Sequence, residues 1–191
     1  MKLSVQSLWQ SAVKTAQRFP VVVADALVVT ALALTNTWGY AKSGAYPKLL
    51  LTFILGFHLL LSLKLFAERR NWPAKTQALL PLLGTLPLAV YYFSLTTSGM
   101  ANGIRFAVLL TSALFLLSFA PYTSRGEVNG FWRYNKALVL GFAASGFASI
   151  ALMTGISIAL AGINYLLGVH VPDWLYGKLW LITGCFIWPF I

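Results

Sequence analysis

The chain has 191 residues, of which 59% are hydrophobic and only 9% are charged, and its net charge is +10. Water-soluble domains carry about a quarter of their residues as charged ones, so this composition excludes a soluble globular protein and predicts a surface covered mostly by lipid. The cations lie in short connections between apolar runs, where they meet the anionic headgroups of a lipid bilayer. We therefore expect the bilayer as a partner, and no nucleic acid.

Residues 1–19 have the pattern of an amphipathic helix. Apolar side chains recur at helical spacing from Leu3 to Phe19, and lysine, arginine and glutamine fill the other side. This pattern predicts a helix that lies in the membrane interface, with Trp9 as an anchor. The alternative is an N-terminal extension of the first span. A cleaved signal peptide is not expected, because no apolar core closely follows Lys2.

Apolar runs separated by glycine, proline and charged residues occupy the rest of the chain. A helix needs about twenty residues to cross a bilayer, and most of these runs reach that length. The predicted fold class is therefore an all-α, polytopic transmembrane helix bundle over residues 20–191. We expect about six spans, at 20–38, 48–67, 78–97, 104–122, 137–168 and 176–191.

The distribution of lysine and arginine predicts the direction of threading. With a cytoplasmic N-terminus, ten of these cations flank the inner ends of the spans and four flank the outer ends, as the positive-inside rule favours. The inner group is Lys2, Lys14, Arg18, Lys64, Arg69, Arg70, Lys75, Arg125, Arg133 and Lys136, and the outer group is Lys42, Lys48, Arg105 and Lys178.

The last two runs have unusual lengths. A helix over 137–168 would measure about 48 Å, against a hydrocarbon core of about 30 Å, so we expect it to extend beyond the membrane or to break near residues 162–164. Gly141, Ser145 and Ser149 lie four apart, which allows close helix contact and suggests a place at the centre of the bundle. The run from Tyr176 has sixteen residues and no basic residue after it, so we expect an N-terminal part of a longer protein.

Two connections carry a resemblance to a known family. The second span leads into AERRNW and the fourth, after FAPY, into RGEVNGFWRYNKAL, and the chain later reads LYGKLWLITGCFIW. From about Arg18 onward the chain resembles the bacterial membrane family named domain of unknown function 4153. The resemblance implies a polytopic protein of the bacterial cytoplasmic (inner) membrane and brings no activity. Asp25 and His58 lie outside the pattern. Its most specific residues are Ala67, Glu68, Arg69, Gly126, Glu127, Asn129, Gly130, Phe131, Trp132, Asn135 and Lys136.

Asp25 is the one acid within an expected span, where a charge costs about 2.5–3.5 kcal/mol on insertion scales. It lies five residues after Pro20, and Lys64 lies four residues before Glu68, so both are about 6–8 Å from the cytoplasmic end of their spans. We predict an Asp25–Lys64 ion pair between the first and second spans. The pair would serve either a proton or ion pathway or the packing of the two helices.

His58 lies near the middle of the second span. A histidine at this depth suits proton relay, and the alternative is a neutral imidazole hydrogen-bonded to a backbone or hydroxyl group of a neighbouring helix. No histidine, cysteine or acid lies near it at ligand spacing, so we expect neither a metal ion nor another cofactor. Pro81 and Pro87 in the third span are interpreted as kinks, because no second run repeats such a break.

The stretch RGEVNGFWRYNK, residues 125–136, combines a turn dipeptide at Asn129-Gly130 with aromatic rings and cations suited to the headgroup level. It is either an interfacial turn or a docking surface for a partner protein or for the protein's own C-terminal domain. We also expect Glu68 or Glu127 to form a salt bridge with an arginine of the other cytoplasmic turn. The candidate docking surface comprises Glu68, Arg69, Trp72, Arg125, Glu127, Asn129, Phe131, Trp132, Arg133 and Asn135.

Three functions fit this sequence. The favoured hypothesis is a membrane-embedded scaffold or interaction module, because no nucleophile–base pair, phosphate-binding glycine loop or metal cluster is recognisable. The second is a transporter or channel element that uses Asp25 and His58. The third is part of a lipid-handling membrane enzyme, for which we would expect a polar pocket lined by Arg69, Trp132 and Arg133.

Overall fold

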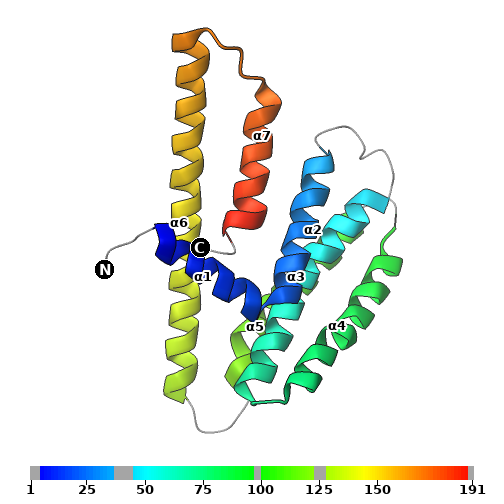
Figure 1. The fold of residues 1–191 in the computed structure, drawn as a ribbon. Coiled ribbons are helices and arrows are strands. Elements are labelled where there is room, and N and C mark those ends of the chain that lie inside the picture. The colour runs from blue at the N-terminus through cyan, green and yellow to red at the C-terminus, as the bar shows by residue number, and fades with distance from the viewer. Residues whose placement is uncertain (1–4, 37–44, 97–99, 123–127, 189–191) are drawn as a thin grey trace.

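The computed structural model describes residues 5–36, 45–96, 100–122 and 128–188, and within these ranges the regular structure is entirely helical (Figure 1). The all-α class predicted from the composition is confirmed. The elements in chain order are α1 (Val5–Arg18), α2 (Pro20–Asn36), α3 (Ala45–Arg69), α4 (Ala74–Ser94), α5 (Met100–Phe119), η2 (Ala120–Tyr122), α6 (Val128–Leu167), α7 (Asp173–Ile182) and the π-helical turn η3 (Thr183–Ile187).

Four of the described helices are long and apolar enough to cross a membrane: Ala45–Arg69, Lys75–Ser94, Met100–Tyr122 and Asn129–Leu167. They correspond to the second to fifth expected spans. The first expected span is a shorter apolar helix, whose 17 residues in α2 reach about 26 Å. Where the sixth was expected, the 10 residues of α7 run into η3. These two are shorter than a typical span.

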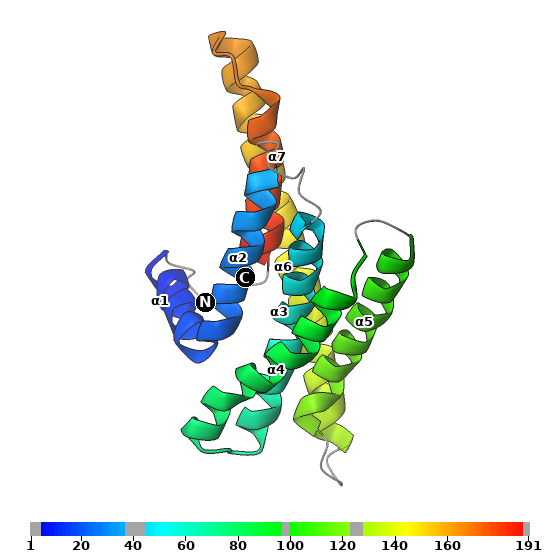
Figure 2. The ribbon, with the colours of Figure 1, turned by 90° about the vertical axis from the view of Figure 1, so that its right-hand side faces the viewer.

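The central helix is α3, and α2, α4 and α5 pack around it (Figures 1 and 2). Its residue Leu55 forms a core cluster with Tyr91 and Leu95 from the α4 end and with Ala113 of α5. The prediction that the long helix of the fifth run lies at the centre is therefore wrong. Helix α6 lies at the periphery, where it packs against α7 and η3 and meets α5.

Helix α6 has 40 residues and continues through 162–164, so the break considered there does not occur. At 1.5 Å per residue its length is about 60 Å, twice the thickness of a hydrocarbon core. It extends past the neighbouring helices at its C-terminal end (Figure 1), which is the other outcome expected from its length. Gly168 follows with φ +65°, a left-handed conformation that stops the helix and lets α7 run back beside it.

Helix α1 meets α2 at an angle and does not extend it in a straight line (Figure 1). Pro20 opens α2, where a residue without an N–H group loses no hydrogen bond. Helix α4 is continuous through Pro81 and Pro87, so neither proline interrupts it.

The solvent-accessible surface of the chain is 12835 Å². A compact soluble protein of the same mass, 20.9 kDa, would expose about 9,000 Å². The excess includes large apolar side chains such as Phe93, which is 82% exposed, and Phe147, which is 79% exposed. Apolar area of this extent fits contact with lipid and with other apolar helices.

Candidate functional site

Helix α3 ends in a tight turn that the sequence specifies locally. The Trp72 N–H donates to the Ala67 carbonyl at 3.1 Å, and the Asn71 N–H donates to the Glu68 carbonyl at 3.0 Å. Asn71 has φ 52°, a left-handed conformation that asparagine adopts more readily than most residues. The Trp72 ring meets the Phe66 ring edge-on at 5.6 Å. These bonds and this contact are the Schellman motif, and they fix Glu68 at the end of α3.

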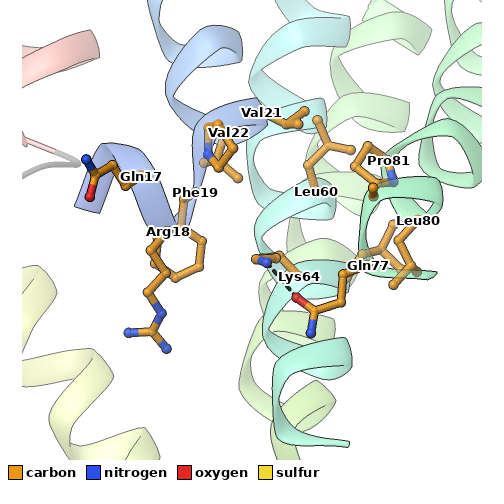
Figure 3. Close-up of a pocket in the computed structure, with 13 residues that line it drawn as sticks. Gln17, Arg18, Phe19, Val21, Val22, Leu60, Lys64, Gln77, Leu80 and Pro81 are labelled. Atoms are coloured by element: carbon orange, nitrogen blue, oxygen red, sulfur yellow. Dashed lines mark hydrogen bonds between the residues drawn. The ribbon is translucent and has the colours of Figure 1, made fainter. Parts of the chain in front are cut away.

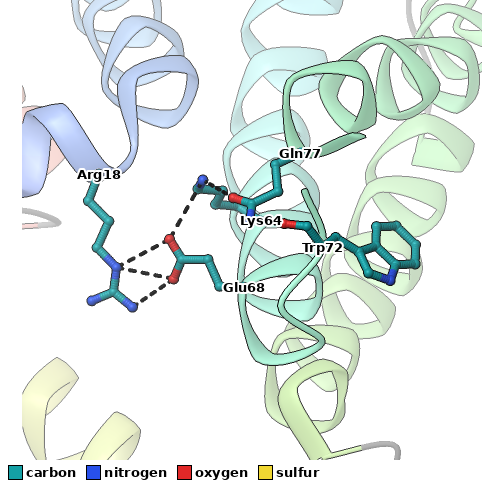
Figure 4. Close-up of polar contacts among 5 residues, drawn as sticks. All are labelled: Arg18, Lys64, Glu68, Trp72 and Gln77. Atoms are coloured by element: carbon teal, nitrogen blue, oxygen red, sulfur yellow. Dashed lines mark hydrogen bonds and ion pairs between the residues drawn. The ribbon is translucent and has the colours of Figure 1, made fainter. Parts of the chain in front are cut away.

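A polar cluster joins the end of α1 to α3 and α4 (Figure 4). The Glu68 carboxylate accepts hydrogen bonds from Arg18 Nη2 at 2.7 Å and from Arg18 Nε at 3.1 Å. Lys64 Nζ lies 3.6 Å from the same carboxylate and donates to Gln77 Oε1 at 2.7 Å. Gln77 Nε2 in turn donates to the Trp72 carbonyl at 2.8 Å. The hydrogen bonds to Glu68 raise the pKa of Arg18 above its ordinary value.

The predicted ion pair between Asp25 and Lys64 does not form. Among the described residues, Asp25 Oδ2 is buried without a hydrogen-bond partner, and the side chain of Asp25 faces Gly56 of α3. A Cβ placed on Gly56 would lie 3.2 Å from Asp25 Oδ1. Asp25 and Lys64 lie at similar depths in their helices, but this did not bring them into contact. The long side chain of Lys64 reaches Glu68 instead, one turn nearer the end of α3.

His58 is half-buried, and its Nδ1 lies 2.9 Å from the Ile54 carbonyl, one turn earlier in α3. In a neutral imidazole, Nδ1 therefore carries the proton and donates. The ring also meets Phe57 edge-on at 5.3 Å. A backbone-bonded imidazole was one of the two expectations, but the acceptor belongs to the histidine's own helix and not to a neighbouring one.

An aromatic cluster connects the end of α5 with the start of α6. Phe131 stacks on Phe119 at 5.3 Å, and Tyr122 of η2 meets Tyr134 at 5.5 Å. The guanidinium of Arg69 lies 5.1 Å from the centre of the Tyr122 ring. The end of α3 therefore contacts Tyr122 through this cation–π interaction, and Tyr122 in turn contacts the start of α6.

The salt bridge expected between those two turns is not formed by Glu68, whose carboxylate contacts Arg18 and Lys64. Glu127, the other acid named in that prediction, and Arg125 lie outside the described residues. The partner of Glu68 was missed because Arg18 is fifty positions away in the sequence and only the tertiary structure brings it close.

Asn135 ties the end of α5 to the start of α6. Its Nδ2 donates to the Phe131 carbonyl at 3.1 Å and to the Ser118 carbonyl at 3.4 Å, and the Ser118 hydroxyl donates to its Oδ1. The Tyr134 hydroxyl donates to the Leu117 carbonyl at 3.1 Å. The last carbonyls of a helix lack partners within the helix, so α6 supplies donors to the end of α5. The sequence signal is an asparagine three residues after the aromatic pair Phe131-Trp132, and from the sequence alone it is assigned to a candidate docking surface.

The structure divides the candidate docking surface into three groups. Four members make internal contacts, namely Glu68, Trp72, Phe131 and Asn135. Four have exposed side chains, namely Arg69, Asn129, Trp132 and Arg133, although Arg69 and Trp132 also contact the rings of Tyr122 and Phe131. Arg125 and Glu127 lie outside the described residues.

A pocket of about 310 Å³ lies between the α1–α2 junction, α3 and α4 (Figure 3). Arg18, Lys64 and Gln77 line its polar part, and Leu60 and Leu80 belong to its apolar part. It is not the pocket expected for a lipid-handling enzyme, since Arg69, Trp132 and Arg133 do not line it. No sequence motif indicated it, because its lining comes from three separate segments of the chain, within 17–22, 60–64 and 77–81.

In the described ranges, no three or more histidine, cysteine, aspartate or glutamate side chains are grouped so that they could hold a metal ion. The chain matches no protein-family model, no curated protein and no solved structure.

Proposed function

We propose that this protein is a membrane-embedded scaffold whose cytoplasmic end binds an acidic segment of a partner protein. The observation that carries the proposal is the presentation of Trp132, whose side chain is 67% exposed at the start of α6. Its neighbours Phe131, Tyr134 and Asn135 hold α6 against α5, whereas the side chains of Trp132 and Arg133 are exposed, with the Trp132 ring resting edge-on against Phe131. A rigid aromatic side chain beside an arginine is the composition typical of interface hot spots.

The charges around Trp132 favour an acidic partner. Arg69, Arg70, Lys75, Arg133 and Lys136 are all exposed at this end of the described bundle. The described acid there is Glu68, and its carboxylate is held by Arg18 and Lys64. An acidic segment would complement this excess of cations and speed its association.

We further propose that residues 20–191 cross a bacterial cytoplasmic membrane about six times, with a cytoplasmic N-terminus and α1 in the interface, and that the chain belongs to the domain of unknown function 4153 family. The four long apolar helices and the ten-to-four distribution of cations support this arrangement. In this arrangement α2 is the first crossing, and the segment formed by α7 and η3 is the sixth.

Cysteine labelling tests the orientation. In a Cys185→Ser background, single cysteines would replace Asn71 and Asn129 on the proposed cytoplasmic side, and Gly168 and His170 on the outer side. A membrane-impermeant maleimide applied to intact cells should modify only the cysteines at 168 and 170. In permeabilised cells the same reagent should modify all four cysteines. Modification at 71 or 129 in intact cells would overturn the orientation.

Photocrosslinking in native membranes tests the scaffold function. A photoreactive phenylalanine analogue at Trp132 should give a discrete protein adduct, and the same analogue at Phe147, which is 79% exposed on α6, should give none. The adduct should be lost when Arg133 and Lys136 are changed to glutamate. Lipid adducts alone from both positions would make residues 129–136 an interfacial anchor and contradict the proposal.

A proton or ion pathway is the second candidate, and the buried, unpartnered Oδ2 of Asp25 favours it. His58 and Asp25 are not among the residues that line the pocket between the α1–α2 junction, α3 and α4. Proton flux into liposomes that contain the protein is the measurement, and a flux unchanged by Asp25→Asn would exclude Asp25 as its carrier.

A further inference from the structure

The pocket between the α1–α2 junction, α3 and α4 has a basic end and an apolar wall (Figure 3). Thirteen residues line it, and the charged ones among them are Arg18 and Lys64, both basic. Gln17 and Gln77 add amide groups. Most of the remaining lining is apolar, as at Leu60, Leu63 and Leu80. Such a pocket suits a ligand that is anionic at one end and hydrocarbon at the other.

The two cations are held in place and still have donors to offer. Glu68 fixes Arg18 through Nε and Nη2, and those two bonds leave the second terminal nitrogen of the guanidinium, Nη1, for a ligand. Lys64 Nζ has three N–H donors, of which Gln77 takes one and Glu68 attracts another. Two positive charges face one carboxylate, so a net positive charge remains within this described cluster.

The order of residues along α3 places the basic and apolar parts at different depths. Lys64 lies one turn before Glu68, near the end of α3, and Leu60 lies one turn further into the helix. The cations are therefore nearer the end of the bundle, and the leucine wall is nearer its middle. A phospholipid has the same order, with the phosphate at the membrane surface and the acyl chains below it.

We propose that this pocket binds one anionic phospholipid, with its phosphate at Arg18 and Lys64 and an acyl chain against Leu60, Leu63 and Leu80. The volume of about 310 Å³ accommodates the headgroup and the first part of a chain. Bound there, the lipid contacts α2, α3 and α4 and joins the N-terminal helices to the centre of the bundle. This site is separate from the Trp132 surface, and either can exist without the other.

Native mass spectrometry of the full chain, released from nanodiscs of mixed phosphatidylglycerol and phosphatidylcholine, tests this proposal. The wild type should retain one phosphatidylglycerol in preference to phosphatidylcholine. Lys64→Gln should lower that retention about fivefold, the effect expected for the loss of one cation at a membrane surface. Lys64→Arg should restore most of it, because the charge is kept.

Lys75→Gln is the matched control, since Lys75 is an exposed cation of α4 that does not line the pocket. Equal retention by the Lys64→Gln and Lys75→Gln proteins would overturn the proposal, as would equal retention of both lipids by the wild type. The wild-type comparison needs no variant and stands if Lys64→Gln fails to fold. Inorganic phosphate added to the released protein should leave the lipid bound, and displacement by phosphate would identify a site for a free anion instead.

Discussion

Arg18 Nη2 lies 2.7 Å from Glu68 Oε2, and this contact fastens the end of α1 to the end of α3. The two residues are fifty positions apart in the chain. Their side chains are 59% and 23% exposed, so water and ions weaken the attraction. The hydrogen bonds that Nε and Nη2 of the guanidinium donate to the carboxylate give the contact a defined geometry, which favours a measurable effect.

A double-mutant cycle measures this contact. Arg18→Gln and Glu68→Gln should each lower the free energy of unfolding, and their coupling energy should be about 0.5–1 kcal/mol, decreasing with salt. Thermal unfolding in detergent at two ionic strengths is the measurement. The control cycle pairs Lys14→Gln with Glu68→Gln, because Lys14 is an exposed cation of α1. Coupling energies that are equal in the two cycles would show that the Arg18 contact adds nothing.

Asn135→Ala should destabilise the protein by about 1–3 kcal/mol. The change removes the side-chain donor from the Ser118 carbonyl at the end of α5 and leaves the Ser118 hydroxyl without this acceptor. Chemical unfolding followed by tryptophan fluorescence gives the difference. Asn129→Ala changes the same residue type at an exposed position of α6 and should have an effect within about 0.5 kcal/mol. If the two variants were equally stable, the role of Asn135 at the end of α5 would be refuted.

Asp25→Asn should leave the protein at least as stable as the wild type. Asp25 is 7% exposed and its Oδ2 has no partner among the described residues, so the neutral amide avoids the cost of a buried charge. Removal of one partner of a buried ion pair would instead cost about 3–5 kcal/mol. Unfolding of Asp25→Asn, of Lys64→Gln and of the double variant separates these cases. The changes in the free energy of unfolding from the two single variants should add within about 0.5 kcal/mol in the double variant. A strong coupling energy would instead show that Asp25 and Lys64 do interact.

Gly146→Ala should weaken the packing of α6 against Trp188. A Cβ at Gly146 would lie 3.2 Å from the Trp188 ring, which also donates from Nε1 to the Phe142 carbonyl at 3.3 Å. The expected loss is about 1–3 kcal/mol, typical of a residue too large for its site. Gly141 on the same helix has open space at its Cβ position, so Gly141→Ala should be neutral or slightly stabilising. Thermal unfolding of both variants in one detergent makes the comparison, and a Gly146→Ala protein as stable as Gly141→Ala would rule out this contact.

Local sequence patterns determined which segments are helical and where several of them end. Lipid offers no hydrogen-bond partners to backbone N–H and C=O groups, so an apolar run within a membrane must satisfy them internally by forming a helix. The four long apolar helices could therefore be predicted from hydropathy alone. The turn after α3 was equally predictable, because Asn71 tolerates the left-handed conformation and proline follows Trp72. Ser145 and Ser149 are buried, as small residues at helical spacing suggested, whereas Gly141, the third residue of that series, is exposed with open space at its Cβ position.

The tertiary structure decided which helix is central and which polar groups meet. Composition cannot rank α3 above α6, because both are apolar and the difference lies in which faces find neighbours. Sequence position indicated the depth of Asp25 and Lys64 along their helices, but not the direction in which each side chain points. Lys64 contacts Glu68 and Gln77 and not Asp25. Asn135 and the pocket at Arg18 also depend on segments far apart in sequence. Local sequence patterns determine which segments are helical. The partners of long polar side chains depend on which helices pack together, because a flexible side chain can reach several groups and only the packing brings them close.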